Sequence, residues 1–347
     1  GSRAGVATTA TASTTVAAKG RTLILRMWYP ALPSLEQPAP YFLDEREAEA
    51  NVPSDAGLPP TLFDGIFAWS VLDAQPTRQG RRPTLMLSTG FGVPLTLYSG
   101  LAEDLASHGY VIVGLEHPDG SGIVVYPDGS SSPSPTNLPD TELVHNWSRD
   151  IEFVLKSLPQ AARQTTMSAE ARGAIGLIDY RRVGALGHSL GGAAAVWAAA
   201  ETPMLRASAN LDGKLWGDVL SAGPSSPTLL MLAEGHAEMD PTIAQFLGSA
   251  KATVYQAVVA GATHMNFSDL GFLIAGLNAM DPSITPEDNG LGTIDSARSL
   301  VVQSAYLRAF FGATLSSESS ELLSSNAAEF AEVTLSVQPA MHQTETP

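Results

Sequence analysis

The most informative part of this chain reads VGALGHSLGGAAAVW, residues 183–197. Its centre, GHSLG, matches G-x-S-x-G, with an apolar strand pattern before it and an alanine-rich helical pattern after it. A serine at such a strand-to-helix turn adopts a strained backbone, so the residues two positions away must lack side chains. Gly187 and Gly191 meet that requirement. We therefore expect the turn to present the Ser189 hydroxyl at the carboxyl end of a sheet.

Short apolar runs alternate with helical patterns on both sides of this turn. Continuous rather than alternating apolar residues indicate strands that are covered on both faces, as in a parallel sheet. The sequence therefore predicts one α/β domain over residues 21–315, with helices on both faces of a mostly parallel sheet. The expected strands are 22–29, 84–88, 111–115, 182–186, 208–211, 228–233 and 253–259, and the expected helices are 44–50, 96–108, 142–158, 190–200 and 296–311.

Other parts of the chain lack a clear period. Residues 1–20 are predicted to form a flexible arm, and the proline-rich residues 30–83 are predicted to be mostly loop. Residues 117–140 and 272–295 are expected to be cap or rim loops beside a pocket. Residues 316–347 are rich in serine and are predicted to be a tail with a mobile end.

Composition excludes several classes of function. Among 347 residues, Lys and Arg number 19 and Asp and Glu number 35, so a net charge of −16 disfavours nucleic acid as a partner. The absence of cysteine excludes disulfides, thiolate metal sites and a cysteine nucleophile. No apolar run is long enough for a transmembrane segment, and no cleavable leader is visible. Secretion is slightly favoured over a cytoplasmic location, because a leader can have been removed.

A serine nucleophile needs a histidine to accept its proton. The histidines downstream of Ser189 are His236, His264 and His342. His264 is the preferred base, because it comes late in the chain, in a loop after the expected strand 253–259. His236 follows the preceding strand, one strand too early, and His342 lies in the polar tail. His188 adjoins the nucleophile and is predicted to be structural.

The histidine in turn needs a carboxylate that holds its tautomer and stabilises its charged form. Asp212 ends the expected strand 208–211 and is the preferred acid. The exit loop of the next strand offers three rivals, Glu234, Glu238 and Asp240. For the oxyanion, the amide of Leu190 lies at the start of a helix, where developing negative charge is stabilised.

Several motifs of this chain resemble those of plasma-type platelet-activating-factor acetylhydrolases. The matches share order and similar spacing over residues 84–270 and lie at 88–92, 96–99, 105–111, 116–121, 187–192, 211–213 and 264–269. The termini match only loosely. In this family a histidine often stands before the glycine of the first motif, and here Thr89 takes its place, which bears on loop shape and substrate preference.

The resemblance implies an α/β-hydrolase fold and cofactor-free ester hydrolysis through an acyl-enzyme. A metal site is not expected, because the histidines are scattered along the sequence and no H-x-x-x-H pair exists. The resemblance assigns Ser189 as nucleophile, Asp212 as acid and His264 as base. It also implies an oxyanion hole made by the backbone amides of Phe91 and Leu190. Gly90 and Gly92 flank Phe91 after the first central strand, where a second oxyanion amide is expected.

The substrate is therefore expected to be a small-molecule or lipid-like ester. Relatives of this family also cleave other esters, including polyesters, so polyester hydrolysis is one alternative. An acyltransferase, or a lactonising or cyclising enzyme of a biosynthetic pathway, would use the same triad with a different acceptor. A binding protein that kept the hydrolase shell is a further alternative. Oligomeric state is not readable from the sequence.

Overall fold

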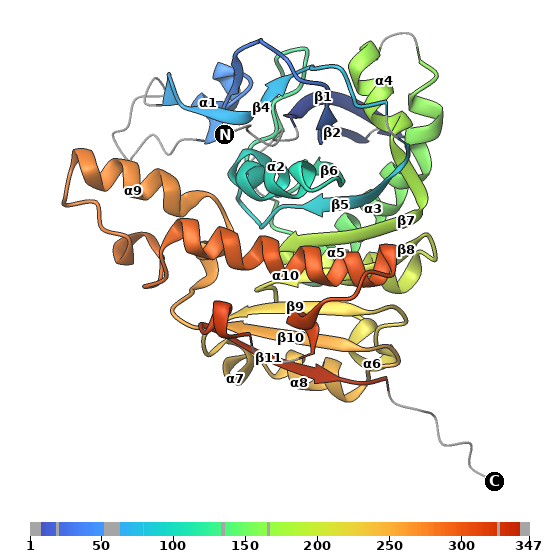
Figure 1. Ribbon diagram of the computed structural model, residues 1–347, viewed down its shortest axis with the longest axis vertical. Helices are drawn as coiled ribbons and strands as arrows, with labels where there is room; N and C mark the ends of the chain where they lie inside the picture. Colours follow the sequence, from blue (N-terminus) through green and yellow to red (C-terminus); the bar gives the residue numbers. More distant parts are fainter. Residues whose placement is uncertain are drawn as a thin grey trace, which may run out of the picture.

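The computed structural model describes residues 8–18, 21–51, 63–78, 80–132, 136–164, 167–324 and 327–340. At its centre is an eleven-stranded sheet in the order β11-β10-β9-β8-β7-β5-β6-β2-β1-β4-β3 (Figure 1). The strands are β1 (Thr8–Ala18), β2 (Arg21–Ala31), β3 (Pro38–Pro40), β4 (Phe67–Leu72), β5 (Arg82–Ser88), β6 (Val111–Glu116), β7 (Ile178–His188), β8 (Leu205–Leu211), β9 (Thr228–Ala233), β10 (Val254–Val259) and β11 (Val333–Gln338).

Along the sheet from β6 through β5, β7, β8 and β9 to β10, each strand is parallel to the next. The outer neighbours of this run, β2 beside β6 and β11 beside β10, are antiparallel. Every residue of β6 and β9 is buried, which explains why these strands read as continuous apolar runs. Their carboxyl ends meet at one edge of the sheet, and this edge carries the loops that follow β5, β7, β8 and β10. The predicted mostly parallel sheet is confirmed.

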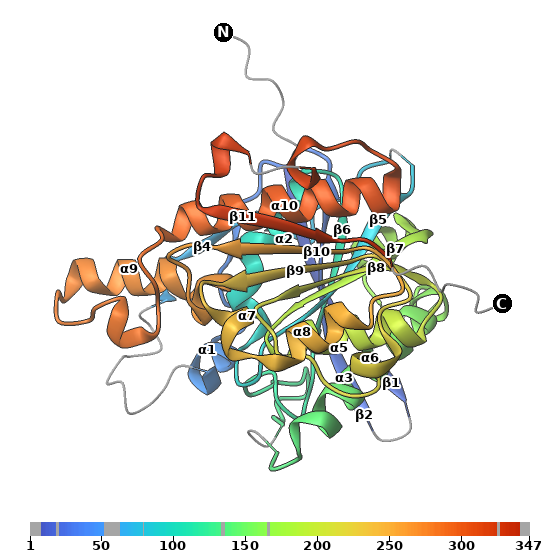
Figure 2. The same ribbon diagram turned by 90° about the horizontal axis from the view of Figure 1, so that it is seen from below.

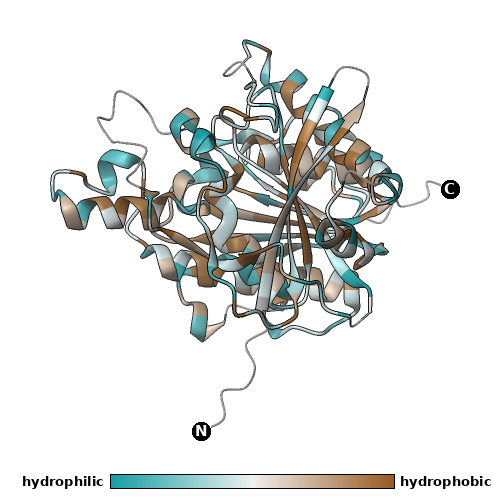
Figure 3. Ribbon diagram, turned by 90° about the horizontal axis from the view of Figure 1, so that it is seen from above, coloured by the Kyte–Doolittle hydropathy of each residue, from teal (hydrophilic) through white to brown (hydrophobic). Residues whose placement is uncertain are grey.

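Helices cover both faces of the sheet (Figure 2). One face carries α2 (Ser99–Ser107) and α10 (Ser296–Ser316), and the other carries α3 (Asp140–Ala161), α5 (Leu190–Glu201) and α8 (Pro241–Gly248). Apolar residues are concentrated in the strands between these layers (Figure 3). The remaining helices are α1 (Glu45–Asn51), α4 (Ala169–Gly176), α6 (Val219–Ala222), α7 (His236–Met239) and α9 (Leu270–Met280), with 3-10 helices η3 (Leu95–Tyr98), η4 (His264–Phe267), η5 (Glu287–Asn289), η6 (Glu321–Leu323) and η7 (Ala328–Phe330).

The prediction of a flexible arm over residues 1–20 is wrong for the described part of it. Strand β1 pairs with β2 along its whole length, from Thr8 opposite Ala31 to Ala18 opposite Arg21. Its small side chains, such as the fully buried Ala10 and Ala12, gave little hydrophobic signal. The run of β-branched threonines nevertheless suits a pleated strand.

The predicted tail over 316–347 is also corrected. Strand β11 pairs antiparallel with β10, from Val333 opposite Val259 to Gln338 opposite Val254. It is an edge strand with only Val333 fully buried, so its apolar alternation is weak. The far end of the tail, with His342, lies outside the described residues.

Two predicted loops contain regular structure. Helix α9 occupies the first part of the expected rim loop 272–295 and projects from the body of the molecule (Figure 1). Strands β3 and β4 lie within the expected loop 30–83, beside the correctly predicted acidic helix α1. The described residues of 117–140 form neither helix nor strand before Asp140, apart from one bridge between Val125 and Ser131. No described helix has the length and apolarity that crossing a membrane requires.

Candidate active site

Ser189 occupies the turn between β7 and α5 with φ 55° and ψ −124°. This positive φ is strained for a residue with a side chain. A Cβ at Gly187 would overlap the carbonyl group of Gly191, and a Cβ at Gly191 would overlap the carbonyl oxygen of Thr89. Both positions therefore require glycine, as the sequence pattern predicted.

His264 begins η4, directly after the loop that leaves β10. Its Nε2 lies 3.0 Å from Ser189 Oγ, and its Nδ1 lies 2.7 Å from Asp212 Oδ2. The turn is held by a capping box between Thr263 and Asn266, in which each side chain bonds the other's backbone amide. The structure thus brings together the three residues predicted as nucleophile, base and acid.

Asp212 follows β8 and is 3% exposed, with φ 54°. Its Oδ1 accepts hydrogen bonds from the Ala233 amide at 2.7 Å and from His236 Nδ1 at 2.8 Å. Burial alone would raise the pKa of Asp212, but hydrogen bonds from His236 and His264 outweigh burial and hold this pKa well below its usual range. Asp212 is therefore ionised throughout the neutral range.

His236, the first residue of α7, is a second histidine on the same carboxylate. Sequence reasoning weighed it only as a base, but its ring contacts Asp212 rather than Ser189. Its hydrogen bond to Asp212 raises the pKa of His236. The position of His236 on the exit loop of β9 is the only sequence signal for this contact, because carboxyl-end loops of neighbouring strands lie side by side.

The three rival acids have other surroundings. Glu234 accepts a hydrogen bond from the Gly261 amide at 2.8 Å. Asp240 caps α8 through the amide of Thr242 at 2.9 Å, and Glu238 is exposed. The Nδ1 atom of His264 instead lies against Asp212.

Phe91 lies on the loop after β5, and Leu190 is the first residue of α5. The amides on either side of Phe91 are bound by the protein: Gly90 N–H donates to the Tyr98 hydroxyl at 2.8 Å, and Gly92 N–H donates to the Gly120 carbonyl at 2.6 Å. The loop conformation is therefore fixed on both sides of Phe91. Phe91 and Leu190 remain the proposed oxyanion donors.

A buried polar network lies where β5 leads into the loop that carries Phe91. Ser88 Oγ lies 3.1 Å from His117 Nε2, and His117 Nδ1 lies 2.9 Å from Asp150 Oδ2. Arg21 pairs with Asp150 at 2.6 Å. The side chains of Ser88 and His117 are fully buried, so this second Ser-His-Asp arrangement is structural. Thr89, which replaces the family's histidine, bonds the Ser121 hydroxyl at 2.7 Å.

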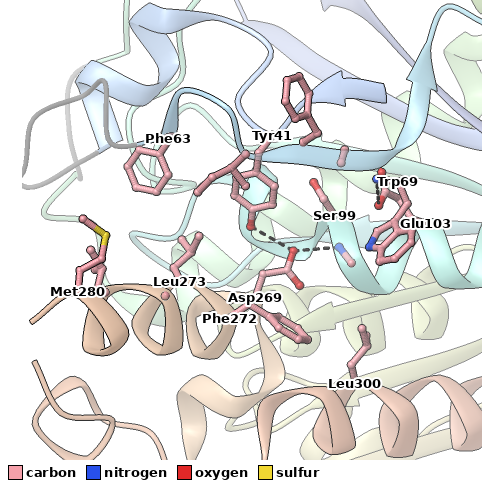
Figure 4. A pocket seen from close by; sticks show the side chains of 16 residues that line it. Tyr41, Phe63, Trp69, Ser99, Glu103, Asp269, Phe272, Leu273, Met280 and Leu300 are labelled. Carbon is pink, nitrogen blue, oxygen red and sulfur yellow. Dashed lines mark hydrogen bonds between the residues drawn. The ribbon is translucent and has the colours of Figure 1, made fainter. Parts of the chain in front are cut away.

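A cavity of about 450 Å³ lies between β4, α2 and α9 (Figure 4). Its lining is mostly apolar and includes Trp69, Phe272 and Met280, but it does not include the Ser189 centre. Asp269 in its wall accepts hydrogen bonds from Tyr41 at 3.1 Å and from the Gly100 amide at 2.9 Å. Burial raises the pKa of Asp269 to about 7. Through its hydrogen bond with the Gly100 amide, Asp269 connects the segment after His264 to the start of α2.

Comparison with known sequences finds similarity to acetylhydrolases and related esterases. Residues 11–156 and 171–314 match the family described as platelet-activating factor acetylhydrolase, isoform II. A probable 1-alkyl-2-acetylglycerophosphocholine esterase of Arthroderma benhamiae is 26% identical over 268 residues, which is 72% of this chain and 65% of that protein. A platelet-activating factor acetylhydrolase of Canis lupus familiaris is 26% identical over 161 residues, 40% of this chain and 36% of that protein.

Among solved structures, a ferulic acid esterase from Streptomyces cinnamoneus superposes with a TM-score of 0.82 at 27% identity. That match covers 96% of this chain and 98% of the esterase. The fold is therefore that of an α/β-hydrolase. By contrast, the chain spans less than two thirds of the length of the two acetylhydrolase-type relatives.

Proposed function

The chain belongs to the family of platelet-activating factor acetylhydrolases, isoform II, and from this premise we propose that it is a serine hydrolase of carboxylic esters. The observation that carries the proposal is the continuous contact from Ser189 Oγ through the His264 ring to the Asp212 carboxylate, with distances of 3.0 and 2.7 Å. These are the distances at which a general base can accept a proton and be held by its carboxylate.

In the first half-reaction, Ser189 Oγ attacks the acyl carbon while its proton passes to His264 Nε2. The ionised Asp212 stabilises the imidazolium, and the amides of Phe91 and Leu190 bind the oxyanion. One oxyanion donor contributes about 10²–10³-fold to the rate in a well-studied protease. When the tetrahedral intermediate collapses, the ester C–O bond breaks, and the imidazolium protonates the departing alcohol. Ser189 is left acylated.

In the second half-reaction, a water molecule gives a proton to His264 and attacks the acyl carbon. The bond from that carbon to Ser189 Oγ then breaks, the imidazolium returns its proton to Oγ, and the carboxylic acid is released. The His264 side chain is 46% exposed, so water reaches the base freely. Water at this exposed base is the acceptor that hydrolysis requires. An acyltransferase, lactonising or cyclising role would instead require acyl transfer to outcompete hydrolysis, which mass spectrometry of the products would detect.

For the substrate, we propose a small-molecule or lipid-like ester. The names of the fungal relative and of the solved neighbour point to an acetylated glycerophosphocholine and to esters of ferulic acid, respectively. A panel of p-nitrophenyl acetate to octanoate, a 2-acetyl phospholipid, methyl ferulate and a polyester oligomer would rank acyl and alcohol groups.

The decisive variant in this panel is Ser189→Ala. We expect it to lower kcat by three or more orders of magnitude, because removing a triad serine leaves only binding and oxyanion stabilisation. Ser107→Ala, which removes a hydroxyl at the end of α2, is the control and should retain wild-type rates. Equal rates for wild type and Ser189→Ala on every ester would refute the proposal.

A further inference from the structure

A chain of hydrogen bonds joins the three segments that meet at the candidate active site. The Gly90 N–H donates to the Tyr98 hydroxyl at 2.8 Å. The same hydroxyl lies 2.8 Å from His188 Nδ1, and His188 Nε2 lies 3.0 Å from the carbonyl oxygen of His264. This series of hydrogen bonds therefore runs from the loop after β5, by way of Tyr98 at the end of η3, to the end of β7 and then to the loop after β10.

The donors and acceptors in this chain have only one consistent assignment. A carbonyl oxygen can only accept, so His188 Nε2 must carry the proton that bonds His264. Burial lowers the pKa of His188 to about 3, so the ring is neutral near pH 7 and has a single N–H. Its Nδ1 is consequently an acceptor, and the Tyr98 hydroxyl donates to it while accepting from Gly90.

Each contact point is at, or one residue away from, a proposed reacting group. Gly90 precedes Phe91, whose amide is a proposed oxyanion donor, and His188 precedes Ser189. The third contact is the backbone of His264 itself. Sequence separations of 90 and 76 residues mean that no local backbone geometry sets these distances.

Close packing leaves the side chains in this series of hydrogen bonds little room to move. Tyr98 and His188 are each 1% exposed. A Cβ added at Gly90 would lie 3.0 Å from both Tyr98 Oη and His188 Nδ1, and 3.4 Å from Ser189 Cβ. Removing the partner of a polar group buried in this way raises the free energy of the folded state, since bulk water cannot replace the lost hydrogen bond.

We propose that Tyr98 and His188 are positioning residues, which hold the oxyanion loop and the base loop in register with the Ser189 turn. This inference rests on the proposed esterase function. The physical reason is that catalysis depends on the relative placement of nucleophile, base and oxyanion donor, and an error of about 1 Å can cost about 10²-fold in rate. The His188 ring also packs against the His264 ring, with centroids 4.5 Å apart. Its two ring nitrogens, however, bond the Tyr98 hydroxyl and the His264 carbonyl oxygen rather than Ser189 Oγ or His264 Nε2.

The first test is Tyr98→Phe, which keeps the ring but leaves Gly90 N–H and His188 Nδ1 unpaired. We expect kcat for p-nitrophenyl acetate to fall about ten- to hundredfold while KM changes less than about threefold, because placement rather than binding is lost. Tyr29→Phe is the matched control. It removes an equally buried hydroxyl, 3.0 Å from the Ala74 carbonyl, and should lower thermal stability without changing kcat.

The second test separates the two arms of His188. Asn offers an acceptor near the position of Nδ1, Gln offers a donor near the position of Nε2, and Phe offers neither. We expect His188→Phe to lose most kcat, and His188→Asn and His188→Gln each to recover part of it. The double variant Tyr98→Phe/His188→Phe should lose no more than His188→Phe alone, because the two residues act as one unit.

Unchanged kcat in folded Tyr98→Phe, or additive losses in the double variant, would overturn the positioning role. Failure of the proposed function would appear differently, since Ser189→Ala would then be as active as wild type. If His188→Phe does not fold, the Tyr98→Phe and Tyr29→Phe pair still decides the question, because both are conservative substitutions.

Discussion

At the scale of single residues, Asp212 holds two histidines with one carboxylate. His264 bonds Oδ2, whereas His236 and the Ala233 amide share Oδ1. The carboxylate is thereby fixed in rotation as well as in charge state. Such a second partner orients the acid in the way that outer-shell groups orient the ligands of a metal.

His236 gives a prediction for stability against pH. Its pKa is raised by the hydrogen bond to Asp212, so its stabilising contribution is fully present below the unfolded pKa of about 6.5 and is lost as pH rises through the folded pKa. His236→Asn keeps a donor but cannot be charged. Urea unfolding should show a larger wild-type advantage over this variant at pH 5.5 than at pH 9. An equal difference at both pH values would contradict the assignment.

The elbow glycines give a second prediction. Gly191→Ala should destabilise the fold by about 3 kcal/mol or more, because the new Cβ meets backbone atoms that cannot move aside. Gly276→Ala is the control, since nothing lies within 4 Å of its added Cβ in α9. It should stabilise by about 0.5–1 kcal/mol, as helical alanine usually does. Urea unfolding measures the free energy of unfolding of both variants. A Gly191→Ala variant as stable as wild type would contradict the close approach of Gly191 to the Thr89 carbonyl oxygen.

The sequence predicted the residues of the central contact but not their support. Ser189 was readable from its glycines, and Asp212 and His264 from their places after strands and from a family resemblance. The bond from Tyr98 to His188 has no sequence signature, and the only sequence signal for the bond from His236 to Asp212 is the position of His236 on the exit loop of β9. Both depend on which loops lie side by side after folding, which apolar periodicity does not encode.

At the scale of elements, the central strands were predictable because burial on both faces demands continuous apolar runs. The edges of the sheet were not. Strand β1 is rich in threonine and alanine, and most of β11 faces solvent, so neither shows the usual pattern. Helix α9 was missed because the proline- and glycine-containing residues after it suggested a loop throughout 272–295.

The corrected C-terminal region can be tested by truncation. Strand β11 pairs with β10, and β10 leads into the loop that carries His264. Ending the chain after residue 320 should therefore lower both the free energy of unfolding and kcat, since β10 becomes an edge strand. Ending it after residue 340 keeps β11 and serves as the control. Full stability and activity in the shorter chain would show that β11 contributes nothing.

At the scale of the whole molecule, buried carboxyl groups set how stability depends on pH. Burial, with repulsion from Glu47, raises the pKa of Glu116 to about 8, and burial raises that of Asp269 to about 7. The folded state thus keeps protons that the unfolded chain releases near pH 4, so these groups make stability fall as pH rises from about 4 to 8. His188 has the opposite effect, but only below about pH 6.5, where the unfolded chain gains a proton.

The raised pKa values of Glu116 and Asp269 predict that the protein unfolds at lower urea concentration at pH 8.5 than at pH 6.5. Glu116→Gln should reduce the difference, because glutamine keeps an acceptor for the Leu95 amide without a titrating proton. A midpoint that is equal or higher at pH 8.5 would contradict the buried-acid account. The net charge of −16 adds self-repulsion of the same sign as more carboxyls ionise.

The central claim is that Ser189 is a nucleophile activated by His264. The most direct measurement is covalent labelling by a fluorophosphonate, located by peptide mass spectrometry in wild type, Ser189→Ala and His264→Ala. We predict one adduct on the wild-type peptide that contains Ser189, none on Ser189→Ala, and labelling slowed by about 10³-fold in His264→Ala. Labelling of Ser189→Ala at the wild-type rate, or an adduct on another residue of the wild type, would contradict the claim.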